Sequence, residues 1–344
     1  MDVAVKNAPV ILCRTHADAA TGFGHLMRML TLAEALRERG AQVRFALGGD
    51  PAAFAVARAQ GFEPEPRDRF TTAEAPATPR PAAVLVDSYL YGPEYLRAWR
   101  EAGVPAAIID DLADRDLPAE LVINPNITAD ESRPVYRRLG GRRLLLGLSY
   151  ALLRPEFASA RDTAPDQRLR VMIIFGATDI GRKTAWATKA LSDVAEDFAL
   201  EVVIGPGAPT RAEVEAAVRA AAAKGREVEL VASPENLPAR MARASLAVSA
   251  GGVTATELAC LGRPAVLAPV ADNQVAAAAR WAEENVHRLL RRADDADELR
   301  ALAALLVRSP NLRQAMGASG RQLVDGKGAG RAAGEILHWL GREE

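Results

Sequence analysis

Short apolar runs alternate with longer amphipathic runs along the chain, and this alternation predicts repeated strand–helix units. The short runs are rich in β-branched residues, which is typical of buried strands in parallel sheets. The predicted strands of the first half are residues 10–14, 42–46, 83–86, 106–109, 121–123 and 143–146. A second series follows at residues 170–175, 200–204, 228–231, 246–249 and 265–268. The pattern therefore predicts an α/β fold.

Two helices are especially clear in the pattern. Residues 25–39 carry an apolar stripe along one face, and Gly40 supplies a stop signal. The chain closes with a second amphipathic run over residues 329–340, which suits a helix that packs onto a domain.

Length and composition favour two domains. At 344 residues the chain exceeds the size at which a single core usually stops growing, and 49% hydrophobic with 25% charged residues is typical of globular proteins. The polar stretch 161–168 interrupts the strand–helix pattern, so the linker is expected there. The prediction is two Rossmann-like doubly wound domains in tandem, residues 1–162 and 163–325, followed by residues 326–344.

Charge and cysteine content limit the class of partner. The formal net charge is −1 with both signs interspersed, so the basic footprint of a nucleic-acid binder is absent and a small-molecule partner is expected. Cys13 and Cys260 lie in separate apolar runs, which suits a reducing, cytoplasmic location. No apolar stretch reaches membrane-spanning length, and residues 1–9 do not have the pattern of a signal peptide. The oligomeric state stays open.

A glycine-bearing turn separates the first predicted strand from the first predicted helix. Gly22 and Gly24 precede His25, which falls in the first helical turn. Ligands of open α/β folds collect at the carboxyl ends of the strands, where a helix N-terminus offers N–H groups to an anion. The helix dipole disfavours an imidazolium ion here, so a neutral, proton-accepting ring is expected. A capping or packing histidine is the alternative, because the turn lacks the third glycine of the dinucleotide fingerprint.

A second glycine turn follows the predicted strand 246–249. The N–H groups of Gly251 and Gly252 and the hydroxyl of Thr254 could hold a diphosphate, and Glu257, one turn further, could accept hydrogen bonds from a ribose diol. The alternative for Glu257 is that it only complements the helix dipole.

Three further loops at predicted strand ends carry polar or glycine residues. Asn273 and Gln274 suit sugar hydroxyl or acetamido groups, although a helix N-cap by Asp272 or Asn273 is an equal alternative. Gly176 opens the turn after the first strand of the second domain, and Tyr89 follows a strand of the first domain. Several such loops together are what a ligand-binding cleft requires.

Other chemistries lack their sequence signals. The chain has no Gly-x-x-x-x-Gly-Lys phosphate loop, no Gly-x-Ser-x-Gly elbow and four histidines in all, none paired at helical spacing. The carboxylates of Asp110 and Asp111, and of Asp114 and Asp116, follow a predicted strand and are expected to be solvated or capping groups. No metal site and no cofactor are predicted.

Several of these segments resemble, in the right order, the UDP-diacetamido-trideoxy-altropyranose hydrolase of pseudaminic acid biosynthesis, PseG, together with the related spore-coat protein SpsG. The most specific stretches are residues 22–28, 109–115, 150–157 and 250–252 leading to Glu257. The resemblance covers most of the chain. It implies a GT-B architecture like that of the MurG glycosyltransferase, with a cleft between two domains and a final helix that returns toward the first.

The resemblance also implies a metal-independent hydrolysis that releases UDP from a sugar. Carried over residue by residue, His25 would activate water at the anomeric carbon, with Gly22, Gly24, Arg28 and Tyr89 on the substrate side. Asn273 and Gln274 would hold the sugar. The nucleotide would be held by Gly176, Gly251, Gly252, Thr254 and Glu257.

The chain departs from the family pattern next to the first glycine turn. The family reads Arg-x-Asp-Ala-Ser, whereas this chain has His16 at the Asp position and Asp18 at the Ser position. Thr256 stands where a Trp is usual, before the ribose glutamate. The sugar and the base are therefore left open. A glycosyltransferase of the same fold and a nucleotide-sugar-binding protein without catalysis are the alternatives to a hydrolase.

Overall fold

The computed structural model describes residues 8–18, 20–67, 70, 79–179, 181–205, 208–232, 234 and 236–341. The chain forms two compact units. The N-terminal unit combines Met1–Leu153 with Lys327–Glu344, and the C-terminal unit is Arg154–Gly326. Residues 1–7, which belong to the segment without a signal-peptide pattern, lie outside the described residues.

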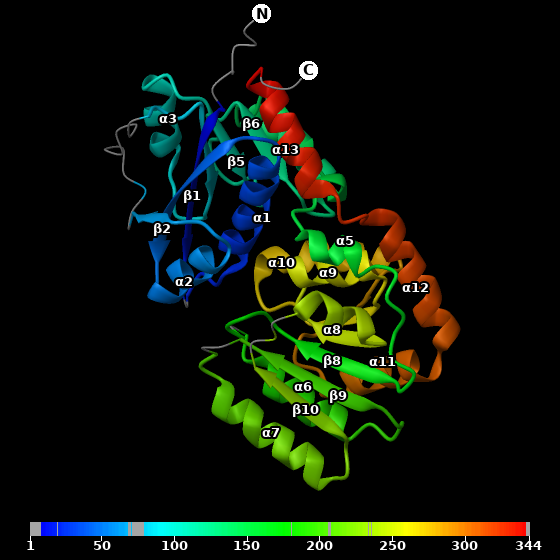
Figure 1. Cartoon of the computed structure of the whole chain (residues 1–344). Coiled ribbons are helices and arrows are strands. Elements are labelled where there is room, and N and C mark those ends of the chain that lie inside the picture. Colours follow the sequence, from blue (N-terminus) through cyan, green and yellow to red (C-terminus); the bar gives the residue numbers. More distant parts are fainter. Residues whose placement is uncertain are drawn as a thin grey trace, which may run out of the picture. The chain divides into compact units, whose positions relative to one another are not determined.

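The N-terminal unit is built on a seven-stranded parallel sheet with the strand order β3-β2-β1-β4-β5-β6-β7 (Figure 1). In chain order its strands are β1 (Val10–Ala17), β2 (Gln42–Gly49), β3 (Pro64–Pro66), β4 (Ala83–Asp87), β5 (Ala106–Ile109), β6 (Leu121–Asn124) and β7 (Arg143–Leu146). β1 lies at the centre and pairs with β2 on one side and β4 on the other.

Helices cover both faces of this sheet. They are α1 (Gly24–Glu38), α2 (Pro51–Ala59), α3 (Pro93–Glu101), α4 (Arg133–Arg138) and α13 (Gly328–Trp339), with short 3₁₀ turns at η1 (Ala129–Ser132) and η2 (Leu148–Tyr150). Side chains alternate between the faces, as a strand requires: Ile11 and Cys13 pack with α1, α2 and α13, whereas Leu12 packs with α3 and α4. Residues from the two ends of the chain thus share one core.

The C-terminal unit contains a six-stranded parallel sheet in the order β10-β9-β8-β11-β12-β13. The strands are β8 (Arg170–Ile174), β9 (Ala199–Ile204), β10 (Val228–Ala232), β11 (Leu246–Ser249), β12 (Ala265–Leu267) and β13 (Arg288–Leu289). The helices are α5 (Pro155–Ser159), α6 (Lys183–Ser192), α7 (Arg211–Ala223), α8 (Leu237–Arg243), α9 (Val253–Leu261), α10 (Asp272–Glu283), α11 (Ala296–Arg308) and α12 (Pro310–Leu323). Each unit is therefore a doubly wound Rossmann-like domain, as the sequence predicts.

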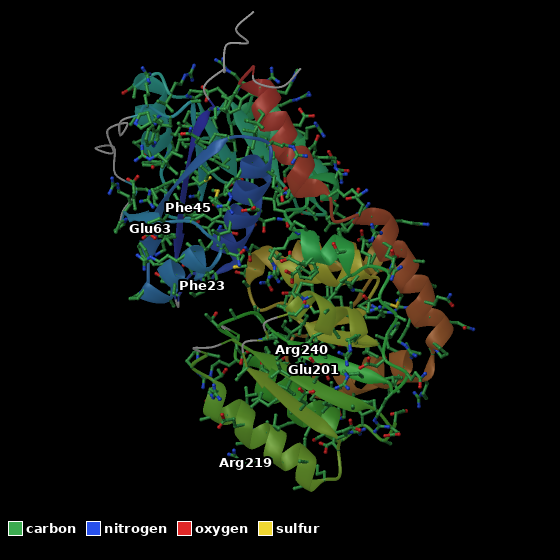
Figure 2. All side chains as sticks on the ribbon, in the orientation of Figure 1. Phe23, Phe45, Glu63, Glu201, Arg219 and Arg240 are labelled. Carbon is green, nitrogen blue, oxygen red and sulfur yellow. The ribbon has the colours of Figure 1, made fainter. Side chains whose placement is uncertain are left out.

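One charged group is buried inside the C-terminal sheet. Glu201 lies on β9, and Figure 2 shows it beside Arg240 of α8, whose Nη1 donates to its Oε1 at 2.9 Å. Arg170 of β8 lies 3.7 Å from the other carboxylate oxygen. Because a buried carboxylate is costly without a partner, these two cations explain why a strand interior tolerates glutamate here.

The domain boundary lies earlier in the chain than the sequence indicates. The first unit ends at Leu153, before α5, rather than in residues 161–168. That polar stretch is hydrogen-bonded inside the C-terminal unit: Arg161 donates to the carbonyls of Arg321 and Asp325, and Arg263 donates to the carbonyl of Thr163. Arginine side chains paired to backbone carbonyls make a polar segment part of a folded domain, which its composition cannot indicate.

Each predicted strand is found with its ends no more than three residues from the predicted positions, and there are two informative differences. β1 continues past Arg14 to Ala17, because β2 supplies parallel partners as far as Gly49. Two short edge strands, β3 and β13, are absent from the prediction. β3 contains two prolines, which are tolerated only at an edge, and β13 has two residues, so neither leaves a periodic pattern.

Both sheets reverse their strand order at one point. In the N-terminal sheet the chain leaves β1 toward β2 and later returns to place β4 on the other side of β1. In the C-terminal sheet the same reversal occurs between β8 and β11. The loops after these strands splay apart at the carboxyl edge, which is where open α/β sheets bind ligands. Within the described part of the chain no helix has the length and apolar character to cross a membrane.

Candidate functional site

The turn after β1 brings His25 to the reversal point of the N-terminal sheet. Gly22 has φ +75°, a left-handed conformation that glycine adopts without strain, and it is bridged to Asp18. α1 begins at Gly24, above which a Cβ would meet nothing within 4 Å, so the surface beside His25 is open to a ligand. His25 lies in the first turn, as predicted.

A carboxylate fixes the imidazole of His25. Nδ1 lies 2.6 Å from Oδ1 of Asp87, the last residue of β4. Because an ionised carboxylate only accepts, Nδ1 donates its proton to Asp87, and Nε2 is the acceptor nitrogen of the neutral ring. Nε2 has no hydrogen-bond partner among the described residues. Thr15 on β1 holds Asp87 in turn, since its hydroxyl donates to the Asp87 carbonyl at 2.7 Å.

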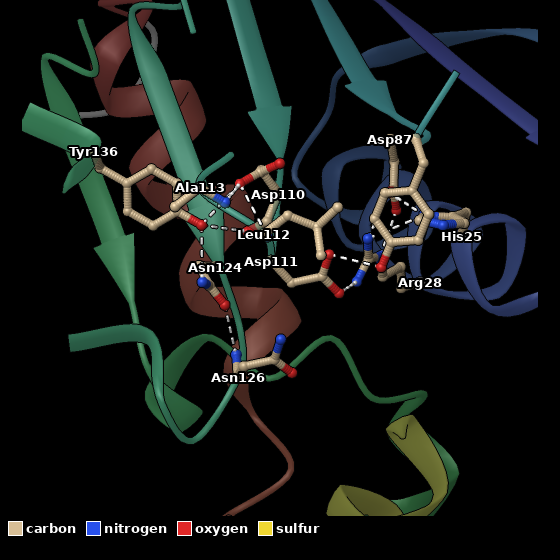
Figure 3. A network of polar contacts seen from close by, with 11 residues as sticks. His25, Arg28, Asp87, Asp110, Asp111, Leu112, Ala113, Asn124, Asn126 and Tyr136 are labelled. Carbon is tan, nitrogen blue, oxygen red and sulfur yellow. Dashed lines mark hydrogen bonds and ion pairs between the residues drawn. The ribbon is translucent and has the colours of Figure 1, made fainter. Parts of the chain in front are cut away.

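Arg28, one turn further along α1, shares this carboxylate. Its Nε and Nη2 donate to the two oxygens of Asp87 at 2.6 and 2.7 Å, and its Nη1 donates to Asp111 at 3.1 Å (Figure 3). Burial by itself raises the pKa of Asp87, but the charge of Arg28 and the hydrogen bonds from His25 and Arg28 lower it below its ordinary value. Asp87 is therefore ionised at neutral pH.

Tyr89 completes the arrangement on the other side of His25. The two rings meet edge to face with centroids 4.3 Å apart, and the Tyr89 hydroxyl donates to Oδ1 of Asp111 at 2.8 Å. Burial and the negative charge of Asp111 raise the pKa of Tyr89, so the phenol stays protonated and acts as a donor. Asp87 and Arg28 thus contact His25 on its Nδ1 side, and Tyr89 packs against its ring.

A second network stabilises the loop that carries Asp111. Asp110 is buried and accepts hydrogen bonds from the Ala113 amide at 2.8 Å and the Tyr136 hydroxyl at 2.9 Å, while Asn124 donates to that hydroxyl at 2.9 Å (Figure 3). Burial raises the pKa of Asp110. The sequence prediction of capping or solvated carboxylates is therefore confirmed for Asp110 as a loop cap, whereas Asp111 is held in an ion pair with Arg28.

The two residues that depart from the family pattern pair with each other. Nε2 of His16 lies 2.9 Å from Oδ2 of Asp18, and Oδ1 of Asp18 accepts from the amides of Ala20 and Thr21. The His16 hydrogen bond and the Thr21 amide lower the pKa of Asp18. His16 therefore belongs to β1 rather than to a polar turn, and Asp18 organises the loop that leads to Gly22.

In the C-terminal unit the second glycine turn lies where two helix N-termini meet. α9 begins at Val253 after Gly252, and α10 begins at Asp272 after Ala271, both without a side-chain cap. A Cβ on Gly251 would come within 3.1 to 3.3 Å of α10 at Gln274 and Ala278. The absence of a side chain at Gly251 therefore eases this close approach, and the first N–H groups of each helix have no intrahelical partner.

Glu257 lies one turn into α9 and is half-buried. Burial raises its pKa to about 7, and the opposing effects of Arg154 and of a hydrogen bond with Thr254 are smaller. The Thr254 hydroxyl, predicted to bind a phosphate, is thus engaged with Glu257.

The amide pair after β12 lies inside α10 rather than at its cap. The alternative of an N-cap by Asp272 or Asn273 is wrong, because Ala271 holds that position. Gln274 accepts from the Val270 amide at 3.1 Å through Oε1, which leaves Nε2 near the glycine turn, 3.5 Å from where a Cβ of Gly252 would lie. Asn273 is exposed.

The turn after β8 has an unusual backbone. Gly176 has φ +81° with open space above it, and Asp179 has φ +47° although it is not glycine. Asp179 is buried, caps the start of α6 through the amides of Lys183 and Thr184, and accepts from the Thr210 hydroxyl at 2.7 Å. These contacts hold a conformation that L residues rarely adopt, next to the reversal point of the sheet.

The buried His287 side chain connects α9 to β12 by two hydrogen bonds. Its Nε2 donates to the Ala255 carbonyl at 2.9 Å, and its Nδ1 accepts from the Ala265 amide at 3.1 Å. Burial lowers the pKa of His287 to about 4, so the ring is neutral and can both donate and accept.

The sequence analysis did not identify the residues that hold other side chains or helices in place. Asp111 entered the sequence analysis only as one of the carboxylates that follow a predicted strand, and Asp87 and His287 were given no role there. The available signal for Asp87 was a carboxylate at the end of an otherwise apolar strand, two residues before Tyr89. Nothing local marks His287, since its two partners lie 32 and 22 positions away.

Comparisons with known proteins agree with this architecture. No family model matches the chain. The chain is 25% identical over 321 residues to the spore coat polysaccharide biosynthesis protein SpsG of Bacillus subtilis (strain 168), covering 89% of this chain and 91% of that protein.

Solved structures share the fold at low identity. MurG of Acinetobacter baumannii superposes with a TM-score of 0.64 at 17% identity, covering 96% of this chain and 100% of that one. MnaA of S. aureus with UDP gives 0.66 at 13% identity, covering 97% of each chain. VinC in complex with dTDP gives 0.58 at 16% identity, covering 97% and 100%. The chain is therefore similar to SpsG and has the fold of GT-B glycosyltransferases such as MurG.

Proposed function

We propose that this protein is a nucleotide-sugar hydrolase, which releases UDP or a related nucleotide from an amino-deoxy sugar by attack of water at the anomeric carbon. The observation that carries the proposal is the His25–Asp87 pair, in which a buried carboxylate accepts from Nδ1 at 2.6 Å. The similarity to a polysaccharide biosynthesis protein and to structures that hold UDP or dTDP supports the substrate class.

The geometry of His25 supports the role of a general base. Asp87 fixes the tautomer in which Nε2 carries a lone pair, and Nε2 has no partner among the described residues. In the proposed step a water oxygen bonds to the anomeric carbon and gives its proton to Nε2. The bond between that carbon and the phosphate oxygen breaks, and the nucleotide leaves with all of its phosphate oxygens.

The C-terminal unit supports nucleotide binding. Two uncapped helix N-termini near Gly251 and Gly252 favour an anion such as a diphosphate, with Gly176 giving a second open backbone approach. Glu257 would accept hydrogen bonds from the ribose diol. Its hydrogen-bond partner Thr254 would then lie beside the diphosphate. Asn273 and Gln274 would face the sugar.

Nucleotide release tests the function directly. The protein alone is incubated with a panel of UDP-, CMP- and dTDP-sugars, and free nucleotide is measured. Release without an added acceptor is expected. Release only when a sugar acceptor is added would make the protein a glycosyltransferase, and tight binding with no turnover would make it a binding protein.

Oxygen-18 water tests the bond that breaks. Attack at the anomeric carbon places the label on the sugar, because the nucleotide keeps its own oxygens. Label in the released phosphate would mean attack at phosphorus, which would give His25 no role at the anomeric carbon.

A further inference from the structure

The guanidinium of Arg28 is surrounded by carboxylates of its own protein. Arg28 is 6% exposed, and each of its three nitrogens donates to Asp87 or Asp111. Burial by itself lowers the pKa of Arg28, but the charges of Asp87 and Asp111 raise it well above its ordinary value. Arg28 therefore acts on the site through its contacts with Asp87 and Asp111.

Arg28 opposes proton uptake by His25. Its Nη2 lies 3.0 Å from Nδ1 of His25, and it shares Asp87 with the imidazole. A buried positive charge at this distance destabilises an imidazolium ion, and it also takes up much of the negative charge of Asp87. The pair of Asp87 and Arg28 is neutral as a unit, so these two residues alone give a proton on His25 little stabilisation.

Asp111 changes this balance. With it, two carboxylates and one guanidinium carry one net negative charge beside a neutral His25, and proton uptake by the ring makes the cluster neutral. The fourth neighbour, Tyr89, is a protonated phenol that ties Asp111 to the face of the His25 ring. Among the described residues, Asp87, Arg28 and Tyr89 are the titratable or charged groups that contact the imidazole, and Asp111 contacts Arg28 and Tyr89.

We propose that Asp111 is a positioning residue that sets the proton affinity of His25, by neutralising Arg28 at one end while it anchors Tyr89 at the other. The inference rests on the proposed function only where it speaks of catalysis. The charge coupling itself is a property of the free protein.

The test is a pH titration of the histidine rings by ¹⁵N–¹H NMR in the full-length protein. The His25 signals are identified by their loss in His25→Asn. In Asp111→Asn the His25 titration curve is expected to move to lower pH, since a compensating charge is removed within the cluster. In Arg28→Gln it is expected to rise, because the opposing charge is removed.

Opposite signs separate charge coupling from simple structural damage, which would move both variants in the same direction. Tyr89→Phe is the matched control: it removes the hydrogen bond to Asp111 but keeps every charge, so a shift much smaller than that of Asp111→Asn is expected. If Asp111→Asn does not fold, Asp111→Ser takes its place, and the same fall is expected because the same charge is removed. No change in either variant, or changes of the same sign, would overturn the proposal.

Activity is a separate readout. If the protein is a hydrolase, the acid limb of its kcat profile follows the NMR shift in each variant. Opposite NMR shifts in a protein that turns over no nucleotide-sugar would leave the coupling intact and reject the proposed function.

Discussion

The two candidate sites occupy equivalent places in their sheets but differ in what they are made of. At the N-terminal reversal point the strand ends carry charged side chains, Asp87 and Asp111, bonded to Arg28 and His25 of α1. At the C-terminal reversal point the strand ends carry glycines, and helix N-termini supply partial positive charge. One fold thus provides two kinds of ligand environment.

The difference indicates a division of roles. A preformed network of short hydrogen bonds holds an imidazole in one tautomer, which favours proton transfer in a fixed geometry. In the C-terminal site, the N-termini of α9 and α10 have no side-chain cap, and the adjacent turn carries glycines. Such helix N-termini favour an anion that accepts hydrogen bonds from their N–H groups. Substitutions in the first site should therefore reduce turnover, and substitutions in the second should reduce affinity.

The largest expected effect is on turnover. General-base assistance contributes roughly a hundred- to ten-thousand-fold in rate, so His25→Asn should lose about that factor in kcat while the dissociation constant of the nucleotide barely changes. Steady-state kinetics and titration calorimetry measure the two quantities. Equal losses in both would break the division of roles, because His25 would then be a binding residue.

The second prediction concerns stability at acid pH and His287. The pKa of this residue is lowered from 6.5 to about 4 by burial, so the unfolded chain takes up the proton first as the pH falls. The contribution of His287 to the free energy of unfolding should therefore decrease by about 3 kcal/mol between roughly pH 6.5 and pH 4, and this contribution changes no further below that window.

His287→Gln is the matched variant for this window, since an amide can still donate to Ala255 and accept from Ala265 without titrating. Urea unfolding of both proteins at several pH values isolates the contribution. Parallel curves for the two proteins would show that His287 does not couple α9 to pH.

The third prediction concerns nucleotide affinity and Glu257. Loss of a charge-assisted contact to a ribose diol should weaken binding of the nucleoside diphosphate by about 1.5 to 3 kcal/mol in Glu257→Ala. Because burial raises the pKa of Glu257 to about 7, the carboxylate form increases as the pH rises through this value, and affinity should increase from pH 6 to pH 8.

The phosphate of the ligand also titrates near pH 6, so Glu257→Gln is the control that keeps this contribution alone. Calorimetry on both proteins gives the difference. The same pH dependence in both would assign it to the ligand and reduce Glu257 to a partner of the helix dipole.

The smallest effect is expected at the residues that depart from the family pattern. If His16 and Asp18 adjust sugar recognition, the double variant His16→Asp, Asp18→Ser should shift turnover between sugars while the protein stays folded. A serine hydroxyl can still accept from the Thr21 amide, so the melting temperature should change little. Uniform loss on every sugar tested would argue against retuning.

Local patterns in the sequence determined the elements and the turns. Strand periodicity located eleven of the strands, and the glycines at positions 22, 251 and 252 marked turns that the structure places at sheet edges. The place of His25 in the first turn of a helix followed from the same reasoning. These features depend on contacts within a few residues, which a local pattern records.

Only the tertiary structure decided which side chains act together. Asp87 lies 62 positions from His25, and Asp111 lies 83 positions from Arg28. They meet because β4 and β5 return to the far side of β1, and the strand order of a sheet is set by long-range packing rather than by the period of any one strand. The boundary at Leu153 and the inward-facing His287 were decided in the same way, by hydrogen-bond partners that the local sequence does not contain.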